Sequence, residues 1–294
     1  MSFFPGEAGV PGLARTFVTH LRPASWPVVF LHFSAGWGVA AAHGGWVASP
    51  AEGATLGVFW TVFLNGGTLG LNSAIDRDSG AIGYLQRPPP VQPGQAVLCV
   101  AWMLAGGVGS ALLSLPVGAT YGVCILLSVA YSVPPVRLKA RPGFDLGVNM
   151  LGYGALTFLA GVLAAGEGRP GFWVLALGFA FLFAALYPLT QLYQIDADRA
   201  AGVRTLAIML GRRRSLDVAT GAALLAHALF AAGFLMAGFH AGQVTWLLLP
   251  AGLWMALLGG WRAGRVRDEK AAMYWGTRLY GFADVVVVGI AVLG

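Results

Sequence analysis

The sequence predicts an all-α polytopic membrane protein with nine transmembrane helices. Of its 294 residues, 57% are hydrophobic and only 10% are charged, whereas soluble domains carry roughly 25% charged residues. A membrane-spanning helix needs about 20 mostly apolar residues, and stretches of that kind recur along the chain. Lysine and arginine gather between alternate stretches, as is typical of a chain that crosses a membrane many times. The composition therefore excludes a soluble domain with a single core.

The nine predicted spans are apolar runs separated by short polar segments. The fourth run is the shortest, and it ends where Pro134 and Pro135 stop a helix. We place the spans at Trp26–Ala42, Ala54–Ile75, Gly94–Leu113, Gly118–Ser132, Phe144–Ala165, Gly171–Gln194, Leu216–Gly238, Val244–Trp261 and Ala271–Leu293. Residues 1–294 then form one domain, in which we expect two similar halves, roughly residues 20–135 and 144–294.

Basic residues accompany the predicted spans in a regular order. Two precede the first span, two follow the second, three follow the fourth, five follow the sixth and four follow the eighth, which makes 16 of the 18 lysines and arginines. The opposite loops contain only Arg169. By the positive-inside rule, we expect the N-terminus and the charged loops in the cytoplasm, and the C-terminus on the opposite side of an inner or plasma membrane. The net charge of +6 therefore indicates topology, and we expect no nucleic-acid partner.

Several other features carry little functional information. The N-terminus has no basic region followed by a short apolar core and a cleavage site, so we expect no cleaved signal peptide. Cys99 and Cys124 both fall inside spans, where we expect small packing residues and neither a disulfide framework nor a metal cluster. The histidines show no metal-ligand spacing. His32 and His227 lie inside spans, where they either satisfy a polar need at a helix interface or face a cavity.

The chain has 12 acidic residues, and four of them form two similar clusters at the ends of predicted spans. One pair follows the second span and the other pair follows the sixth. Both span ends lie on the basic side of the membrane, so the two clusters suggest one shared site. We call Asn72, Asp76 and Asp78 the first station, and Gln194, Asp196 and Asp198 the second station.

An amide side chain precedes one aspartate of each station by four residues. Asn72 and Asp76, like Gln194 and Asp198, therefore share one face if the chain is helical there. Two such faces can converge on a hard cation. Mg²⁺ takes oxygen ligands and is typically held by one or two carboxylates together with substrate phosphates. The spacing thus indicates a Mg²⁺ site.

The remaining aspartates fit this interpretation less simply. Asp78 and Asp196 lie off the shared faces, and they reach the same ion only if the helix unwinds, which Gly80 would permit in the first station. The alternative is that the aspartates cap helices or pair with arginines at the surface. The repetition of one spacing at two span ends favours a site, because polar groups at membrane depth are costly and are usually functional.

A basic segment, "YSVPPVRLKARPG" (Tyr131–Gly143), follows the fourth span. Arg137, Lys139 and Arg141 alternate along it. Arginine binds phosphate oxygens bidentately, and lysine acts as a point charge. Topology alone also explains such a run, but further arginines lie beside both stations. Together these cations enclose a site suited to a diphosphate bridged by Mg²⁺.

These motifs resemble those of the UbiA superfamily of intramembrane prenyltransferases. "NSAIDRD" (Asn72–Asp78) is similar to the family signature N-D-x-x-D-R-(E/D)-x-D, and Arg87-Pro88 is similar to the R-P that follows it. "YSVPPVRLK" is similar to Y-S-x-P-P-x-R-x-K. "QIDADRAAGVRTLAIMLG" (Gln194–Gly211) is similar to D-x-x-x-D-R-x-x-G-x-x-T-L-x-x-x-x-G. The resemblance covers the chain from the first span to the ninth.

The resemblance implies nine helices around a central apolar cavity that opens sideways to lipid under a cytoplasmic cap. It implies that Mg²⁺, held by the two stations, binds an isoprenyl diphosphate whose tail lies in the cavity, and that the allylic cation alkylates an acceptor. The expected metal ligands are the six residues of the two stations, with Asp76 and Asp198 catalytic. The expected substrate-binding residues are Arg77, Arg87, Arg137, Lys139, Arg199, Arg204, Tyr131 and Tyr193.

Three carboxylates of the family signatures are missing. Ser73 and Gly80 replace aspartates of the first motif, and Gln194 replaces the first aspartate of the second motif. The lower charge predicts that Mg²⁺ binds weakly unless the diphosphate contributes ligands. It marks the chain as a divergent member of the family.

We expect the chain to be a Mg²⁺-dependent prenyltransferase that acts on an aromatic or lipophilic acceptor, with membrane lipid around it. The first alternative is a membrane terpene cyclase of the same fold, in which the cation is attacked by its own distal alkene and no acceptor is needed. A second alternative is a non-catalytic protein that binds or transports lipids.

Overall fold

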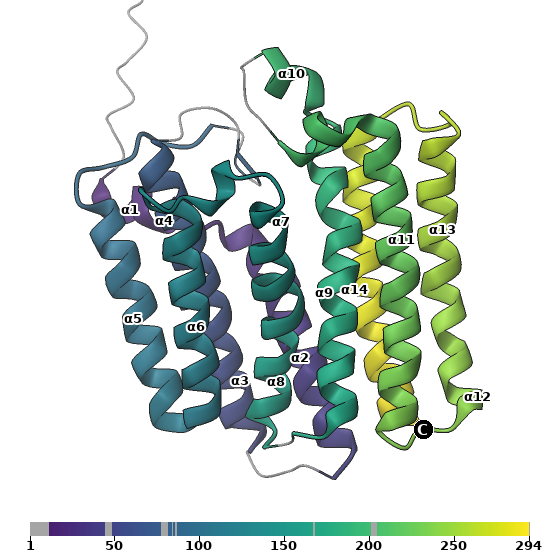
Figure 1. Ribbon diagram of the computed structural model, residues 1–294. Coiled ribbons are helices and arrows are strands. Elements are labelled where there is room, and N and C mark those ends of the chain that lie inside the picture. The colour runs from purple at the N-terminus through teal and green to yellow at the C-terminus, as the bar shows by residue number, and fades with distance from the viewer. Residues whose placement is uncertain are drawn as a thin grey trace, which may run out of the picture.

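The computed structural model describes residues 12–44, 49–77, 82–83, 85, 87–166, 168–200 and 205–293. Within these residues the regular structure is helical, and the only β contact is an isolated antiparallel bridge between Ile82 and Leu85. The long helices stand side by side in one bundle, and shorter helices lie across one end of it (Figure 1). This arrangement confirms the predicted all-α membrane fold.

The first part of the structure contains the helices up to and including the short one in the basic segment. They are α1 (Leu13–His20), η1 (Pro23–Ser25), α2 (Trp26–Ala42), α3 (Pro50–Val58), the π-helical segment η2 (Phe59–Asn65), α4 (Gly66–Asp76), α5 (Gln95–Leu113), α6 (Leu115–Ser132) and η3 (Leu138–Ala140).

The second part contains the remaining helices. They are α7 (Phe144–Asn149), the π-helical segment η4 (Met150–Leu156), α8 (Thr157–Ala164), α9 (Pro170–Leu192), α10 (Ile195–Ala200), α11 (Leu206–Met236), α12 (Ala241–Val244), η5 (Thr245–Leu247), α13 (Leu248–Arg262) and α14 (Glu269–Leu293).

Eight continuous helical segments in the described residues are long and apolar enough to cross a membrane. Several of them join two or three elements, as in Pro50–Asp76 and Phe144–Ala164. The one predicted span that is not among these eight is the first, which is α2, and its bounds are as predicted. It has 17 residues, or roughly 26 Å at 1.5 Å per residue, which is at the short end of the range for a spanning helix. The fourth span is longer than predicted, because α6 begins at Leu115 with Pro116 in its first turn, where proline is tolerated.

Two hydrophobic clusters form the interior and meet on α2 and α8. Val29 and Phe33 of α2 pack with residues of η2, α4, α5 and α6, whereas Val39 of the same helix packs with residues of α9, α11 and α14. The contact between α2 and α8 is very close. A Cβ placed on Gly36 would lie 1.9 Å from the Phe158 carbonyl oxygen, and one on Gly161 would lie 1.9 Å from the Phe33 carbonyl oxygen. Glycines thus let the two central helices touch backbone to backbone. The predicted division of the chain into two similar halves stays a prediction.

Both π-helical segments have side chains that hydrogen-bond to their carbonyls. Trp102 Nε1 donates to the Val62 carbonyl at 3.0 Å in η2, and Thr157 Oγ1 donates to the Gly152 carbonyl at 2.8 Å in η4. A π-helical turn changes the backbone bonding pattern, and polar groups at membrane depth need partners inside the protein. The side chains supply these partners.

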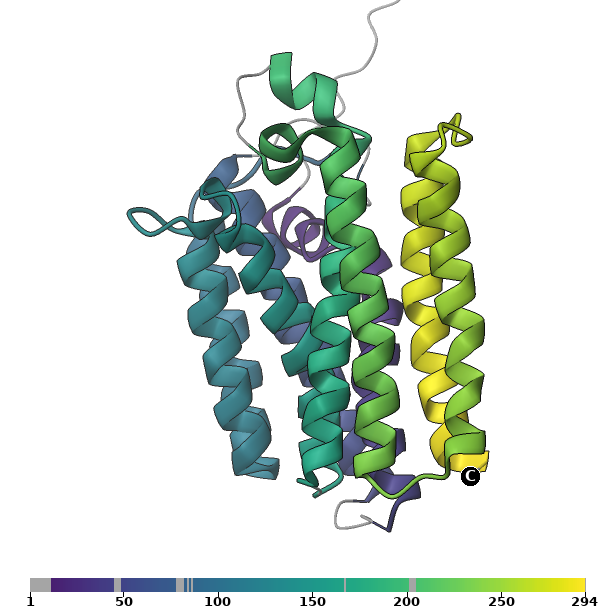
Figure 2. The same ribbon diagram turned by 45° about the vertical axis from the view of Figure 1, so that its right-hand side comes forward.

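Two helix ends beside the second station differ from the prediction. The sixth predicted span ended at Gln194, but α9 ends at Leu192 and a separate short helix, α10, follows after a turn. The seventh span begins earlier than predicted, at Leu206, with a break at Gly211, whose φ is 75°. Glycine takes this left-handed conformation at little cost. Both views place α10 above the ends of α9 and α11, outside the bundle (Figures 1 and 2).

Candidate functional site

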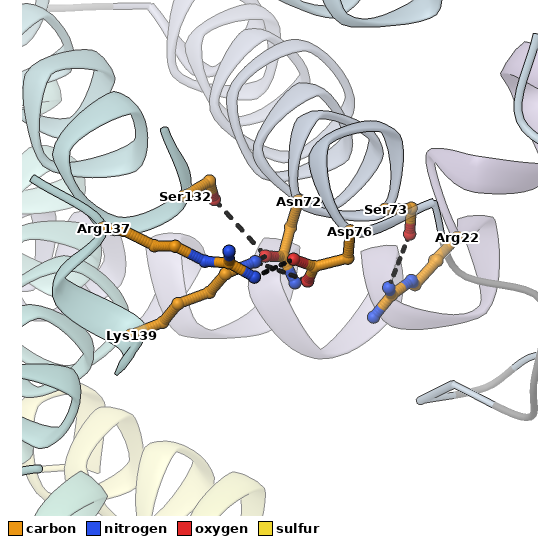
Figure 3. A network of polar contacts seen from close by, with 7 residues as sticks. All are labelled: Arg22, Asn72, Ser73, Asp76, Ser132, Arg137 and Lys139. Carbon is orange, nitrogen blue, oxygen red and sulfur yellow. Dashed lines mark hydrogen bonds and ion pairs between the residues drawn. The ribbon is translucent and has the colours of Figure 1, made fainter. Parts of the chain in front are cut away.

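The first station lies at the end of α4, where two basic side chains reach it. Lys139 Nζ donates to Asn72 Oδ1 at 2.6 Å and also to Asp76 Oδ2. Arg137 Nη2 donates to Asp76 Oδ1 at 3.0 Å. Figure 3 shows both cations reaching the same face of α4. This confirms that Asn72 and Asp76 share a face.

Local sequence places these groups. α4 ends at Asp76, and the left-handed φ of 53° at Arg77 turns the chain out of the helix. Ser132 ends α6, and its Oγ lies 3.4 Å from Asn72 Oδ1. The two prolines after it cannot continue the helix, so the basic segment turns back over the end of α4. As a result Lys139, whose side chain is only 13% exposed, is held against two oxygen acceptors.

Arg22 is a site residue that the sequence reasoning assigned to topology alone. Its Nη2 donates to Ser73 Oγ at 2.8 Å, on the other side of α4 from Lys139 (Figure 3). The side chain is buried, and its backbone has a left-handed φ of 51°. Ser73, which stands where the family signature has an aspartate, therefore orients a buried guanidinium. The signal in the sequence was the position of Arg22 directly before the first span.

Two adjacent cavities lie inside the bundle below the first station. The first cavity, of about 260 Å³, has Arg22, Asn72 and Tyr131 in its wall. The second cavity, of about 290 Å³, has Tyr193 and His32 in its wall. The residues that line both are Val29, Asn65, Leu69, Tyr153 and Thr157. The predicted apolar cavity is thus present as two cavities with a shared wall, and Asn72 of the first station lies at one end of the first.

The second station is arranged differently from the prediction. Gln194 is not inside a helix; it directly precedes α10, and its carbonyl accepts the Asp198 N–H at 2.9 Å. Its side chain is exposed and donates to the Tyr193 hydroxyl. The sixth span therefore does not carry the second station as predicted, because α9 stops two residues before Gln194. The shared face of Gln194 and Asp198 stays a prediction.

The two aspartates of α10 have different surroundings. Asp196 is 73% exposed and pairs with Arg199 at 3.2 Å and with Arg212 at 2.9 Å. Arg212 also pairs with Glu269 of α14, so it connects α10 to two long helices. Asp198 is partly buried, and this burial raises the pKa of its carboxyl.

The stations contact different parts of the protein. The contacts of Asn72 and Asp76 come from α6 and the basic segment, and those of Asp196 come from α10 and α11. In the part of the chain that the structure describes, no group of three or more His, Cys, Asp or Glu residues gathers as a metal site. Asp78, Gly80 and Arg204 lie outside the described residues. Arg77 and Arg87 are exposed.

The sequence analysis did not identify two buried acidic residues, Asp145 and Asp284. Asp145, at the start of α7, accepts hydrogen bonds from the Tyr187 hydroxyl at 3.0 Å and from Gln191 Nε2 at 3.2 Å. Asp284 lies deep in α14 and is fully buried beside His32. An acid inside an apolar span was the available signal, since such residues are rare and usually functional.

Comparisons with known proteins identify a family and several relatives of this chain. A model of the UbiA prenyltransferase family matches residues 31–278. The bacteriochlorophyll synthase 33 kDa chain of Cereibacter sphaeroides is 30% identical over 237 residues, which cover 76% of this chain and 75% of the relative. The digeranylgeranylglyceryl phosphate synthase of Natronomonas pharaonis is 34% identical over 187 residues, 62% of this chain and 65% of the relative.

Solved structures share the fold. A UbiA homolog from Archaeoglobus fulgidus, bound to GPP and Mg²⁺, superimposes with a TM-score of 0.69. The match covers 92% of this chain and 99% of that structure, at 22% sequence identity.

Proposed function

This chain belongs to the UbiA prenyltransferase family, and we propose that it transfers an isoprenyl group from an isoprenyl diphosphate, bound at the first station, to a lipophilic or aromatic acceptor. One observation carries the assignment of the station: Asn72 lines the polar end of an apolar cavity, and Lys139 joins it to Asp76, which also pairs with Arg137. A diphosphate at this end directs its isoprenyl chain into the cavity. The fold and the family support an enzyme over a lipid-binding protein without activity.

The basic residues provide the anion-binding part of the site. Lys139 and Arg137 neutralise Asp76 in the structure, and the same donors serve a diphosphate through charge-assisted hydrogen bonds. Arg22 adds a buried guanidinium in the wall of the first cavity. These cations stabilise the negative charge that develops on the leaving diphosphate.

The oxygen ligands near the first cavity fit Mg²⁺. Asn72 and Asp76 supply an amide oxygen and a carboxylate, which are hard ligands of the kind that Mg²⁺ takes. Asp198, whose partly buried carboxylate ionises less readily than usual, is the expected contribution from the second station. When bound, Mg²⁺ neutralises the diphosphate and makes it a better leaving group. Asp78, Asp196 and Gln194 stay predicted ligands.

The cavities protect the reactive carbon. The first cavity has an apolar wall that includes Trp60, Leu64 and Tyr153. Such a wall excludes water from the allylic cation, and aromatic faces attract it. Prenyl transfer then forms one bond from the allylic carbon to the acceptor as the bond to the diphosphate oxygen breaks, and the acceptor loses a proton.

Release of diphosphate from geranyl diphosphate tests the site. We expect release by the purified protein to require Mg²⁺ and to be lost in Asp76→Asn. The matched control is Asp217→Asn, because Asp217 also pairs with an arginine, Arg262, and is exposed. Near wild-type release by Asp76→Asn would contradict the proposed site. A cyclic hydrocarbon formed without an acceptor would instead identify a terpene cyclase.

We also propose that the first station and the other basic loops face the cytoplasm. Sixteen of the 18 lysines and arginines lie in the loops on that side or before the first span. The donor diphosphate, a charged molecule with a lipid tail, would reach the site from that surface.

A further inference from the structure

Three buried polar residues deep in the bundle have no role in the donor site. They are His32 of α2 and Tyr280 and Asp284 of α14, with exposed fractions of 3%, 5% and 0%. His32 Nδ1 lies 2.7 Å from Asp284 Oδ1. His32 Nε2 lies 2.9 Å from the Gly154 carbonyl oxygen and 3.2 Å from the Tyr280 hydroxyl. We call these three side chains the buried triad.

The buried triad lies near the middle of the membrane. Tyr280 is 11 residues after Glu269, where α14 begins, which is roughly 16 Å along the helix. Gly154 is 10 residues after Phe144, where α7 begins, or roughly 15 Å. The hydrocarbon core is about 30 Å thick, so the triad is half-way across it. A polar cluster at this depth is costly and needs a reason.

The hydrogen positions follow from the acceptors. A carbonyl oxygen only accepts, so Nε2 of His32 carries a hydrogen that it donates to Gly154. Tyr280 cannot donate to a protonated Nε2, and its oxygen can only share that hydrogen. In the described part of the chain, the contact with His32 is the only hydrogen bond of the Tyr280 hydroxyl. The O–H hydrogen of Tyr280 therefore has no acceptor among the described residues.

Tyr280 and His32 are both part of the wall of the second cavity. The rest of that wall is mostly apolar, and its other polar groups are the Asn65 amide and the hydroxyls of Ser25, Tyr153, Thr157, Thr190, Tyr193, Tyr274 and Thr277. The need of the Gly154 carbonyl in η4 for a hydrogen-bond donor explains why His32 lies there. It does not explain the Tyr280 hydroxyl, which still has a hydrogen to donate. Buried donors usually have a partner, and a ligand in the second cavity would be one.

We propose that the second cavity binds the acceptor and that Tyr280 donates a hydrogen bond to a carbonyl oxygen of that molecule. The proposal rests on the proposed prenyl transfer: the first cavity, which reaches Asn72, takes the isoprenyl chain, and the second shares a wall with it. The acceptor class is thus an apolar molecule that carries a carbonyl group. His32 and Asp284 are positioning residues, because they fix the Tyr280 oxygen and leave its hydrogen directed to the ligand.

Benzophenone and diphenylmethane provide a matched pair of probes, since they have similar shapes and only benzophenone has a carbonyl oxygen. We expect the detergent-solubilised protein to bind benzophenone about 3- to 10-fold more tightly than diphenylmethane, the range for one hydrogen bond. Tyr280→Phe keeps the ring and removes the donor, so the preference should fall to near 1. The ratio of the two affinities is compared, because both probes also dissolve in detergent.

Tyr121→Phe is the control for loss of one buried hydroxyl. Tyr121 is fully buried, contacts the Phe59 carbonyl and lines neither cavity, so the preference for benzophenone should persist. The infrared carbonyl stretch of bound benzophenone is a second measurement, and it should lie at lower frequency in the wild type than in Tyr280→Phe. Equal binding of the two probes by the wild type, or an unchanged preference in Tyr280→Phe, would overturn the proposal.

Activity at the donor site provides a second, independent test of the proposal. Diphosphate release from geranyl diphosphate should have an unchanged KM in Tyr280→Phe. A KM raised as much as the loss of benzophenone affinity would assign the triad to the donor chain and overturn the proposal. If the wild type released no diphosphate but preferred benzophenone, the proposed function would fail and the carbonyl-binding cavity would stand.

Discussion

Single residues in the first station have two kinds of partner. Lys139 and Arg137 pair with Asp76 in the structure, and Lys139 also binds Asn72. Removal of one partner from such a network leaves the others under-compensated. The 13% exposure of the Lys139 side chain means that water screens its charge only partly, so its interaction with a diphosphate should be strong.

Lys139→Ala should weaken donor binding without changing the fold. Loss of a charge-assisted hydrogen bond costs about 1.5–3 kcal/mol, so the Kd for geranyl diphosphate with Mg²⁺ should rise by roughly 10- to 100-fold. Isothermal titration of the purified protein measures this. Arg141→Ala is the control, because Arg141 is exposed in the same segment. An unchanged Kd in Lys139→Ala would remove Lys139 from the site.

At the scale of elements, the contact between α2 and α8 holds the two hydrophobic clusters together. Each helix presents a glycine to the backbone of the other, at Gly36 and Gly161. Small residues let membrane helices approach closely, and the gain is van der Waals packing. The position of α2 also fixes His32, one turn before Gly36, in the wall of the second cavity.

Gly36→Ala should lower thermal stability although alanine favours helices. Its Cβ would lie 1.9 Å from the Phe158 carbonyl oxygen, so α2 and α8 must separate. Overpacking of this kind costs about 1–3 kcal/mol, and we expect the Tm in detergent to fall by roughly 2–10 °C.

Gly38→Ala, on the same helix, is the matched control for this prediction. Its Cβ would meet Val288 Cγ1 at 3.6 Å, which is ordinary contact. We expect its Tm to stay near that of the wild type. An equal loss of stability in both variants would show that the close approach at Gly36 does not limit stability.

At the scale of the whole molecule, the charged stations and the apolar cavities lie at different depths along the bundle. The stations and α10 lie at one end, and the C-terminal end of α14 lies at the other (Figure 1). The two cavities lie inside the bundle, and residues of α4 form part of the wall of each. A membrane-bound enzyme of this shape takes a charged head group at one surface and apolar chains at membrane depth.

Cysteine labelling tests the orientation. In a chain with Cys99→Ala and Cys124→Ala, whose thiols are buried, Arg141→Cys and Gly242→Cys place one thiol at each end of the bundle. A membrane-impermeant maleimide added to intact cells should label only Gly242→Cys, because the positive-inside rule predicts that the basic loops lie in the cytoplasm. Labelling of Arg141→Cys alone would reverse the proposed topology, and permeabilised cells provide the control for access.

The sequence by itself determined the class of fold and the approximate number of spans, and it predicted the shared face of Asn72 and Asp76. Apolar length and the alternation of basic loops are local properties, and they predicted α2 with its observed bounds. The i, i+4 spacing of Asn72 and Asp76 is also local, because α4 continues through both residues. The family motifs identified the reaction for the same reason: they are short and contiguous.

Only the tertiary structure decided how distant residues combine. α9 stops at Leu192 and does not continue to Gln194, an end that the local sequence did not predict. Arg22 reaches Ser73 across 51 positions of sequence, and His32 reaches Asp284 across 252. The pairing of these groups depends on which helices pack together, and that is set by shape complementarity between whole helices rather than by any local pattern.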